Sequence, residues 1–240
     1  VQIGGILMQP ANPVGVSTGQ ELTPEMQTLI TQLQTIDEKS PPQNAKPAQL
    51  IDYLRQRTAI IEQIVKASRP GQETETWTKQ LINSLTSALQ AGDKPSGVRL
   101  NQLLGNLKQV TPDSSLVAYA EYRQLFASYS SDIGKAATTE QQQKIQTTWL
   151  TNLKTFVSKH PKADDAPDAI LQLALNSEFA ANAVDAKQWY GQLVSKHGQS
   201  PQAVRAAGAL KRMGLRGEPL SLSGPDPSGR TIGVANLKGR

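Results

Sequence analysis

The sequence predicts an all-α fold of antiparallel helical hairpins, followed by a short, incomplete β segment. Apolar residues recur at intervals of three and four over several segments, as on one face of an amphipathic helix. Aromatic residues make up only 5% of the chain, and a core of Ala, Leu, Ile and Val suits packed helices better than a β-sandwich. Only the segment 215–240 alternates short extended stretches with clusters of Gly, Pro and Ser.

Residues 1–21 are predicted to form a flexible leader, because glycines and prolines interrupt them and no apolar period runs through them. The helical-hairpin domain is expected to occupy residues 22–214. Its first helix is expected to begin at Thr23, which is followed by Pro24 and Glu25. A capping hydroxyl, a proline in the first turn and an acid near the helix N-terminus together favour a helix start.

Six apolar stripes of helical spacing precede residue 160. Residues that start or stop helices bound them, and the short connections favour antiparallel neighbours. The stripes lie in a segment from Thr23 to the break at 40–42, in 47–67, in 77–89 with Gly92 after it, in 96–110, in a segment starting at Thr111, and in 145–157.

An internal repeat comes next. The tetrapeptide Val-Ser-Lys-His at 157–160 returns at 194–197, which is a displacement of 37 residues. Small and large residues recur at the same displacement, as two closely packed antiparallel helices require, so the repeat is predicted to be a helical hairpin. The matching pairs are Ala166 with Ala203, Ala169 with Ala206, and Leu173 with Leu210.

Residues 165–213 resemble the tetratricopeptide repeat family. They have a large-x2-large-small opening, an Ala thirteen residues after the Leu, and an aromatic residue four positions later. The turn 156–161 is similar to variants of this repeat in bacterial envelope proteins. The resemblance implies stacked helical hairpins that bind a protein or peptide. The residues that carry it are Ile170, Leu173, Ala174, Ala186, Tyr190 and Leu193.

The segment 215–240 resembles the entry of the thioredoxin-like TlpA/ResA and peroxiredoxin families. Gly217-Glu218-Pro219 precedes an extended stretch, Gly229-Arg230 ends a turn, and residues 237–240 are Leu-Lys-Gly-Arg. In those families a core strand with W-C-x-x-C comes next. The resemblance therefore implies an incomplete thioredoxin-like domain whose active site lies beyond Arg240, in a protein of the bacterial periplasm or cell envelope. The chain itself contains no cysteine, so thiol chemistry within it is excluded.

Charge patterning argues against nucleic-acid binding. From Pro201 onward the chain has seven basic and two acidic residues, which accounts for the whole formal net charge of +5. The remainder is neutral overall and shows no basic run interleaved with aromatic residues. No apolar run approaches the roughly 18 residues that a membrane-spanning helix needs.

Motifs for catalysis, phosphate binding and metal binding are absent from the sequence, so no catalytic residue, cofactor or metal ligand is assigned. His160 and His197 occupy equivalent repeat positions at predicted helix C-termini, where the structural interpretation is favoured over a ligand pair. Asp164 and Asp165 precede Ala166-Pro167, so capping a helix is favoured over acid/base chemistry.

Aromatic residues supply the one candidate contact site. Trp149 and Tyr190 fall on apolar stripes and are predicted to be core residues. Trp189 is adjacent to Tyr190, so the two side chains cannot face the same way. Trp189 is therefore the candidate contact with a neighbouring helix or a partner, although simple packing is the favoured interpretation.

Two functions stay open at this level. One is a non-catalytic helical accessory domain of a thiol-disulfide oxidoreductase, with the thioredoxin-like domain as its intramolecular partner. The other is a stand-alone scaffold that binds a protein or peptide and has no redox activity.

Overall fold

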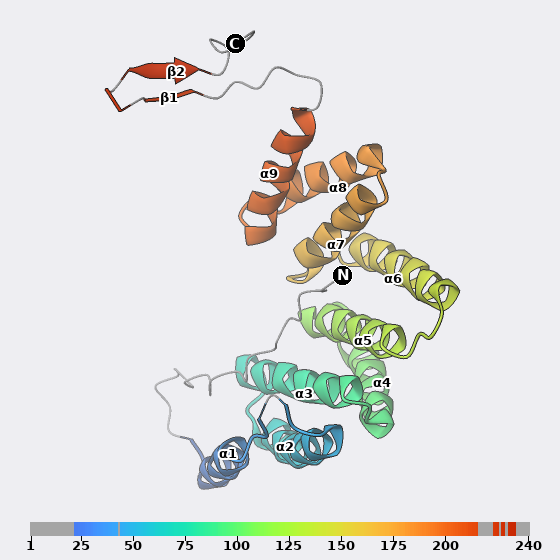
Figure 1. Cartoon of the computed structure of the whole chain (residues 1–240). Helices are drawn as coiled ribbons and strands as arrows, with labels where there is room; N and C mark the ends of the chain where they lie inside the picture. The colour runs from blue at the N-terminus through green and yellow to red at the C-terminus, as the bar shows by residue number, and fades with distance from the viewer. Residues whose placement is uncertain (1–21, 43, 216–222, 226, 229, 234–240) are drawn as a thin grey trace. The chain divides into compact units, whose positions relative to one another are not determined.

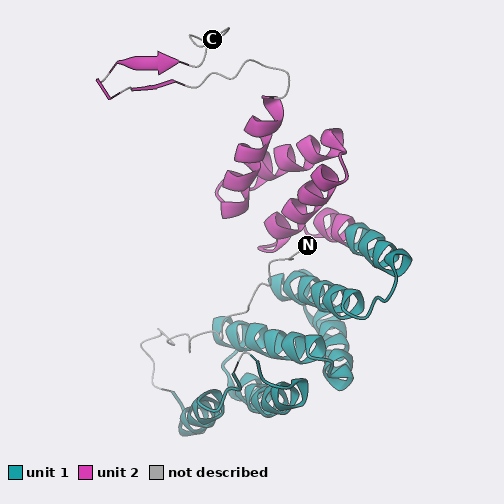
Figure 2. Ribbon diagram, in the orientation of Figure 1, with its two compact units in different colours: residues 1–152 teal, residues 153–240 magenta. Residues whose placement is uncertain are grey.

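The computed structural model describes residues 22–42, 44–215, 223–225, 227–228 and 230–233. Within these ranges its regular structure is helical apart from one small hairpin (Figure 1), which confirms the predicted mostly helical class. Two compact units, residues 1–152 and 153–240, divide the chain (Figure 2), and each is described by itself. The predicted leader 1–21 lies outside the described residues.

The helices begin and end close to the predicted apolar stripes. In chain order the described helices are α1 (Pro24–Asp37), α2 (Pro47–Ala67), α3 (Gln72–Gln90), α4 (Lys94–Val110), α5 (Ser115–Ile133), α6 (Thr139–Lys159), α7 (Ala166–Phe179), α8 (Ala183–Lys196) and α9 (Pro201–Gly214).

The helix boundaries reflect local capping chemistry. The Thr23 hydroxyl accepts a hydrogen bond from the Met26 N–H at 3.2 Å, so the predicted start of α1 is confirmed. The predicted start of α5 at Thr111 is wrong, because Thr111 caps the end of α4 and Pro112 comes directly after that cap, where it prevents the helix from continuing. Helix α5 is instead capped by the hydroxyl of Ser114.

Helix α3 is the centre of the first unit. It packs against α2, α4 and α5, while α1 packs against α2 (Figure 1). One apolar cluster joins all five helices, and burying its side chains supplies the main stabilisation of the unit. Its members are Met26, Leu29, Leu33, Ile61, Ile64, Leu81, Ile82, Leu85, Leu100, Leu104, Leu116, Val117 and Ala120.

In this unit α2 runs parallel to α4, and α3 runs parallel to α5. Residue numbers rise together along each linked pair, which fixes the relative direction of the two helices. The side-chain links are Arg55 with Asp93 and Glu62 with Arg99 from α2 to α4, and Glu75 with Ser115 and Asn83 with Tyr119 from α3 to α5.

Helices α7, α8 and α9 of the second unit all pack on one another, and α8 packs most extensively, on both α7 and α9. Helix α7 buries apolar residues on more than one of its faces. Two polar links show that α7 and α9 are parallel: Gln202 donates to Asp168 at 2.7 Å, and Arg212 bonds to Glu178. Both links join residues 34 positions apart. Equivalent residues of the repeat are 37 apart, so the contacts are offset from equivalence by about one helical turn.

A short antiparallel hairpin lies after the helices. Strand β1 (Ser223–Pro225) pairs with β2 (Thr231–Gly233), with Gly224 opposite Ile232. Residues of β1 are exposed, and Ile232 is 40% exposed. A two-stranded hairpin is only marginally stable alone in water, because neither face is covered. The remaining residues of the predicted β segment, 216–222, 226, 229 and 234–240, lie outside the described ranges.

The turn between α7 and α8 contains the one non-glycine residue with positive φ in the described ranges, Ala181 at 57°. The Ala181 N–H bonds to the Glu178 carbonyl and the Asn182 N–H bonds to the Ser177 carbonyl. These are the two bonds of a Schellman helix end, whose left-handed position is usually Gly because a Cβ is disfavoured there. Ala181 is therefore a strained residue.

Replacing Ala181 with Gly should stabilise the second unit by about 0.5–1 kcal/mol, because Gly removes the steric cost of the left-handed conformation. Hydrogen exchange of the α7 and α8 amides should slow accordingly. Ala180, which has a negative φ of −77°, is the matched control, and Ala180→Gly should not slow exchange. Faster hydrogen exchange of these amides in Ala181→Gly would contradict the inference that Ala181 is strained.

Candidate functional site

Trp189, the candidate for a partner contact, lies on α8 between two buried positions. Ala186 is fully buried and Tyr190 is 1% exposed, whereas Trp189 itself is half-buried. The predicted core positions of Tyr190 and of Trp149, which is 5% exposed, are confirmed. Trp149 stacks on Tyr129 with ring centroids 4.7 Å apart, so it contributes to the packing of α6 on α5 in the first unit. The role of Trp189 in binding a partner stays a prediction.

A polar triad next to Trp189 joins the three helices of the second unit. The Tyr190 hydroxyl of α8 donates to Glu178 of α7 at 2.8 Å, and the same carboxylate accepts from Arg212 of α9. Burial, followed by the hydrogen bond to Glu178, raises the pKa of Tyr190 to about 12. The bonds from Tyr190 and Arg212 lower the pKa of Glu178. The triad thus links the three helices, and its three polar side chains have hydrogen-bond partners within the triad itself.

The α7–α8 turn presents exposed apolar side chains. Phe179 is 84% exposed and Val184 is 77% exposed, and the alanines between them are exposed as well. Neither residue was singled out by the sequence, because helical periodicity marks a buried face and gives no signal for an apolar residue at a turn. The contact between Glu178 and Arg212 was not predicted either, since their separation of 34 differs from the repeat displacement.

The two histidines occupy equivalent helix ends, as predicted. The His160 N–H bonds to the Phe156 carbonyl at 2.8 Å, and the His197 N–H bonds to the Leu193 carbonyl at 2.9 Å. The His160 ring lies 5.4 Å from the Phe156 ring. The Nε2 atom of His197 is buried without a hydrogen-bond partner. Burial and the nearby Lys196 ammonium lower the pKa of His197.

The predicted Asp164-Asp165 pair is placed at the start of α7. Asp165 is 7% exposed and occupies the N-cap position, but its side chain makes no capping hydrogen bond. Its φ and ψ of −86° and −7° are right-handed rather than extended. The extended conformation is the one that normally directs an N-cap oxygen toward the first helical N–H groups. The predicted position is therefore right, whereas the predicted side-chain cap is wrong.

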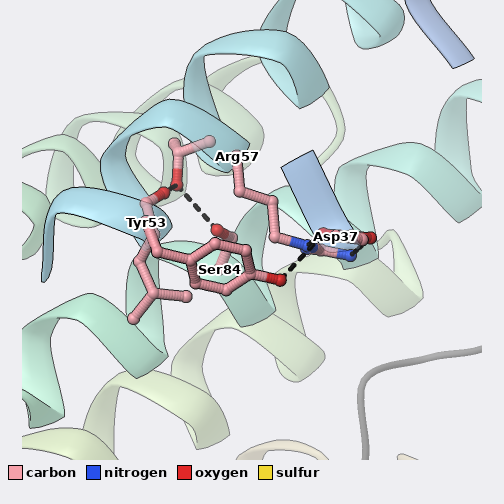
Figure 3. A network of polar contacts seen from close by, with 6 residues as sticks. Asp37, Tyr53, Arg57 and Ser84 are labelled. Atoms are coloured by element: carbon pink, nitrogen blue, oxygen red, sulfur yellow. Dashed lines mark hydrogen bonds and ion pairs between the residues drawn. The ribbon is translucent and has the colours of Figure 1, made fainter. Parts of the chain in front are cut away.

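A second polar cluster ties α1 to α2 in the first unit (Figure 3). Asp37 accepts from the Arg57 Nε and from the Tyr53 hydroxyl, each at 2.8 Å. Nearby, the hydroxyls of Thr58 and Ser84 lie 2.7 Å apart and link α2 to α3. Burial, followed by the bond to Asp37, raises the pKa of Tyr53 to about 12. A perturbed tyrosine can mark a reactive site, but here the shift arises from a closed set of interhelical bonds.

A shallow hollow lies at the α5–α6 turn. It is lined by charged, amide and small apolar groups: Asp132, Lys135, Ala136, Gln141, Lys144 and Ile145. Two of its polar groups already serve the turn, because the Lys135 ammonium bonds to Ser131 and the Gln141 Oε1 accepts from the Ala137 N–H. The hydrogen bonds of the turn therefore account for the positions of the Lys135 and Gln141 side chains.

Comparison with known proteins gives no family assignment. No protein-family model matches the chain, and no curated protein is significantly similar to it. Within the described ranges, no three His, Asp or Glu residues cluster as metal ligands would. The helices in those ranges include none with the length and apolar character required to cross a bilayer.

Asp37→Asn should lower the free energy of unfolding of the first unit by about 2 kcal/mol, because the guanidinium of Arg57 would lose a charged partner. The Arg57 side chain is only 10% exposed, so water cannot fully replace that partner. Urea denaturation followed by circular dichroism measures the change. Asp52→Asn is the matched control, because Asp52 is exposed and bonds only to Gln56 among the described contacts. Equal effects of the two changes would contradict the assigned role of Asp37.

Acid should destabilise the second unit through His197. The pKa of His197 is lowered in the folded chain, so below the ordinary value of 6.5 the unfolded chain binds a proton that the folded chain resists. The contribution of neutral His197 to the free energy of unfolding is fully present above pH 6.5, and it is lost as the pH falls toward the pKa of the folded chain. Unfolding curves between pH 7 and 5 should show a shallower pH dependence in His197→Gln. An unchanged slope would contradict the assignment.

Proposed function

We propose that this chain is a non-catalytic helical accessory and interaction domain of a thioredoxin-like thiol-disulfide oxidoreductase of the TlpA/ResA type. The active site would lie beyond Arg240, and the thioredoxin-like domain would be the partner of the helical units. On the same resemblance, the protein would act in the bacterial periplasm or cell envelope.

The observation that carries this proposal is the hairpin formed by β1 and β2. From the resemblance of residues 215–240 we expect a turn that ends in Gly-Arg and leads into a strand of a hairpin. Strand β2 begins at Thr231, directly after Arg230. The exposed faces of the hairpin would be covered if a larger sheet continued it.

The arrangement of the helices supports the tetratricopeptide-like part of the proposal. Solenoid repeats stack helical hairpins so that each helix meets the equivalent helix of the next repeat in parallel. The contacts between α7 and α9 and those between α3 and α5 have this parallel sense.

The chemistry proposed for the complete protein is thiol-disulfide exchange. The first cysteine thiolate of W-C-x-x-C would attack a substrate disulfide and form a mixed disulfide, with release of one substrate thiolate. The second cysteine would then attack the mixed disulfide, release the reduced substrate and leave the motif oxidised. The helical units would position or recruit the substrate protein.

Determining the coding sequence downstream of Arg240 tests this proposal directly. A strand rich in Val and Leu and then W-C-x-x-C are expected within about 40 codons, as in a thioredoxin-like domain. The longer product should reduce insulin disulfides, whereas residues 1–240 alone, which contain no cysteine, should not. An unrelated downstream sequence or a stop codon there would refute the oxidoreductase assignment.

The alternative, a stand-alone protein-binding scaffold, is favoured by the exposed Phe179 and Val184 beside the half-buried Trp189. Affinity capture with the immobilised chain, analysed by mass spectrometry, should then recover a partner even when no redox domain exists. Trp189→Ala should abolish the capture, whereas Val98→Ala, a change at an exposed residue of the first unit, should not. Capture that ignores Trp189 would contradict its assigned role.

A further inference from the structure

Helices α7 and α9 are equivalent in the 37-residue repeat and bury one stripe in common. Ala166 and Ala169 of α7 are fully buried, and so are their equivalents in α9, Ala203 at 3% exposure and Ala206 at 0%. Helix α9 packs only on helices that precede it, α7 and α8, among the described contacts. On α9 the shared stripe therefore faces the helices that precede it.

A second stripe distinguishes the two helices. On α7 it comprises Pro167, Ile170, Leu171 and Ala174, and all four residues are buried. We call the equivalent positions on α9 the outer face of α9. They are all exposed, and Val204 is 72% exposed. The outer face of α9 consists of Val204, Ala207, Gly208 and Lys211.

Helix α7 has α8 and α9 after it in the sequence, and both pack on it, whereas α9 is the last helix within the described ranges. The outer face of α9 is then the surface on which a further helix would pack if the repeat continued. The described residues after α9 are those of the β1–β2 hairpin, so the repeat supplies no such helix within the described ranges.

The shape of the outer face suits a helix. Ala207 and Gly208 are small, and a Cβ built on Gly208 would meet no atom within 4 Å. A stripe of small side chains forms a groove between ridges, so another helix can approach closely. Val204 is the only large apolar side chain of this face, which is too little apolar area for insertion into a bilayer.

The charge of α9 selects among helical partners. Arg205, Lys211 and Arg212 lie on α9, and no acidic residue occurs from Pro201 to Gly214. Arg212 is bonded to Glu178, whereas Arg205 and Lys211 are exposed and form no ion pair among the described residues. A second copy of α9 would bring like charges together, which is unfavourable, while an acidic helix would complement them.

We propose that the outer face of α9 docks an acidic amphipathic helix of another protein. The docked helix would place small apolar residues against Ala207 and Gly208 and carboxylates beside Arg205 and Lys211. This inference does not depend on the redox assignment, because it concerns only residues of the helical unit.

The probe is a stapled helical peptide of about 20 residues, long enough to span α9, labelled with fluorescein. It has Leu and Ala on one face and Glu at the flanking positions. A second peptide replaces every Glu with Lys. Fluorescence anisotropy with the complete 240-residue chain should show saturable binding of the Glu peptide, weakened by added NaCl, and no binding of the Lys peptide.

Two changes to the chain test the face itself. Gly208→Gln should weaken binding of the Glu peptide at least about tenfold, because the added side chain holds the partner away from the groove. The change occupies open space and raises helix propensity, so it should not unfold α9. The double change Arg205→Glu with Lys211→Glu should reverse the preference, so that the Lys peptide binds instead.

Matched controls separate this face from general effects. Gly105→Gln introduces the same residue at another helical glycine with open space around it, and Lys187→Glu reverses an exposed charge on α8. Both should leave binding within about twofold of the unchanged chain, and circular dichroism should show that every variant is folded.

Several results would overturn the proposal. They are no binding of the Glu peptide at chain concentrations up to about 500 µM, equal binding of both peptides, or binding that Gly208→Gln leaves unchanged. Binding of phosphatidylglycerol vesicles or a DNA duplex without the Glu peptide would assign the basic face to a membrane or nucleic acid instead. Sedimentation that shows a dimer broken by Gly208→Gln would assign it to self-association. None of these results bears on the coding sequence downstream of Arg240, so the two proposals fail independently.

Discussion

Each unit depends on one helix whose apolar surface exceeds what a single neighbour can cover. Helix α7 buries Ile170, Leu171 and Leu173, which point to different sides of the helix. A single antiparallel partner would leave some of this surface in water, at a cost proportional to the exposed apolar area. In the second unit α8 and α9 both pack on α7 and on each other, and in the first unit α2, α4 and α5 all pack on α3.

Polar contacts then fix the position of each packed helix along its neighbour. Apolar burial has no preferred direction, so it tolerates small shifts between helices, whereas a hydrogen bond is lost when its atoms separate. Asp37 joins α1 to α2 and Glu178 joins α7 to α8 and α9. Each carboxylate is shared between an arginine and a tyrosine, so both units use the same chemical device at the edge of an apolar core.

The features that we propose to contact a partner belong to the helices of the second unit. The exposed Phe179 and Val184, the half-buried Trp189 and the outer face of α9 all belong to α7, α8 and α9 or to the turn between them. Exposed apolar residues near a rim of charge are typical of protein contact surfaces.

The sequence by itself determined the helical class, most helix boundaries, the 37-residue repeat and the core positions of Trp149 and Tyr190. These depend on local periodicity and capping, which can be read from neighbouring residues. The start of α5 was misread at Thr111 because Pro112 serves equally well after a helix end and at a helix start. Only the tertiary structure decided that Glu178 meets Arg212 and that α9 leaves exposed the stripe that α7 buries. Both outcomes depend on which helices pack together, and that choice is made by contacts between residues distant in the sequence.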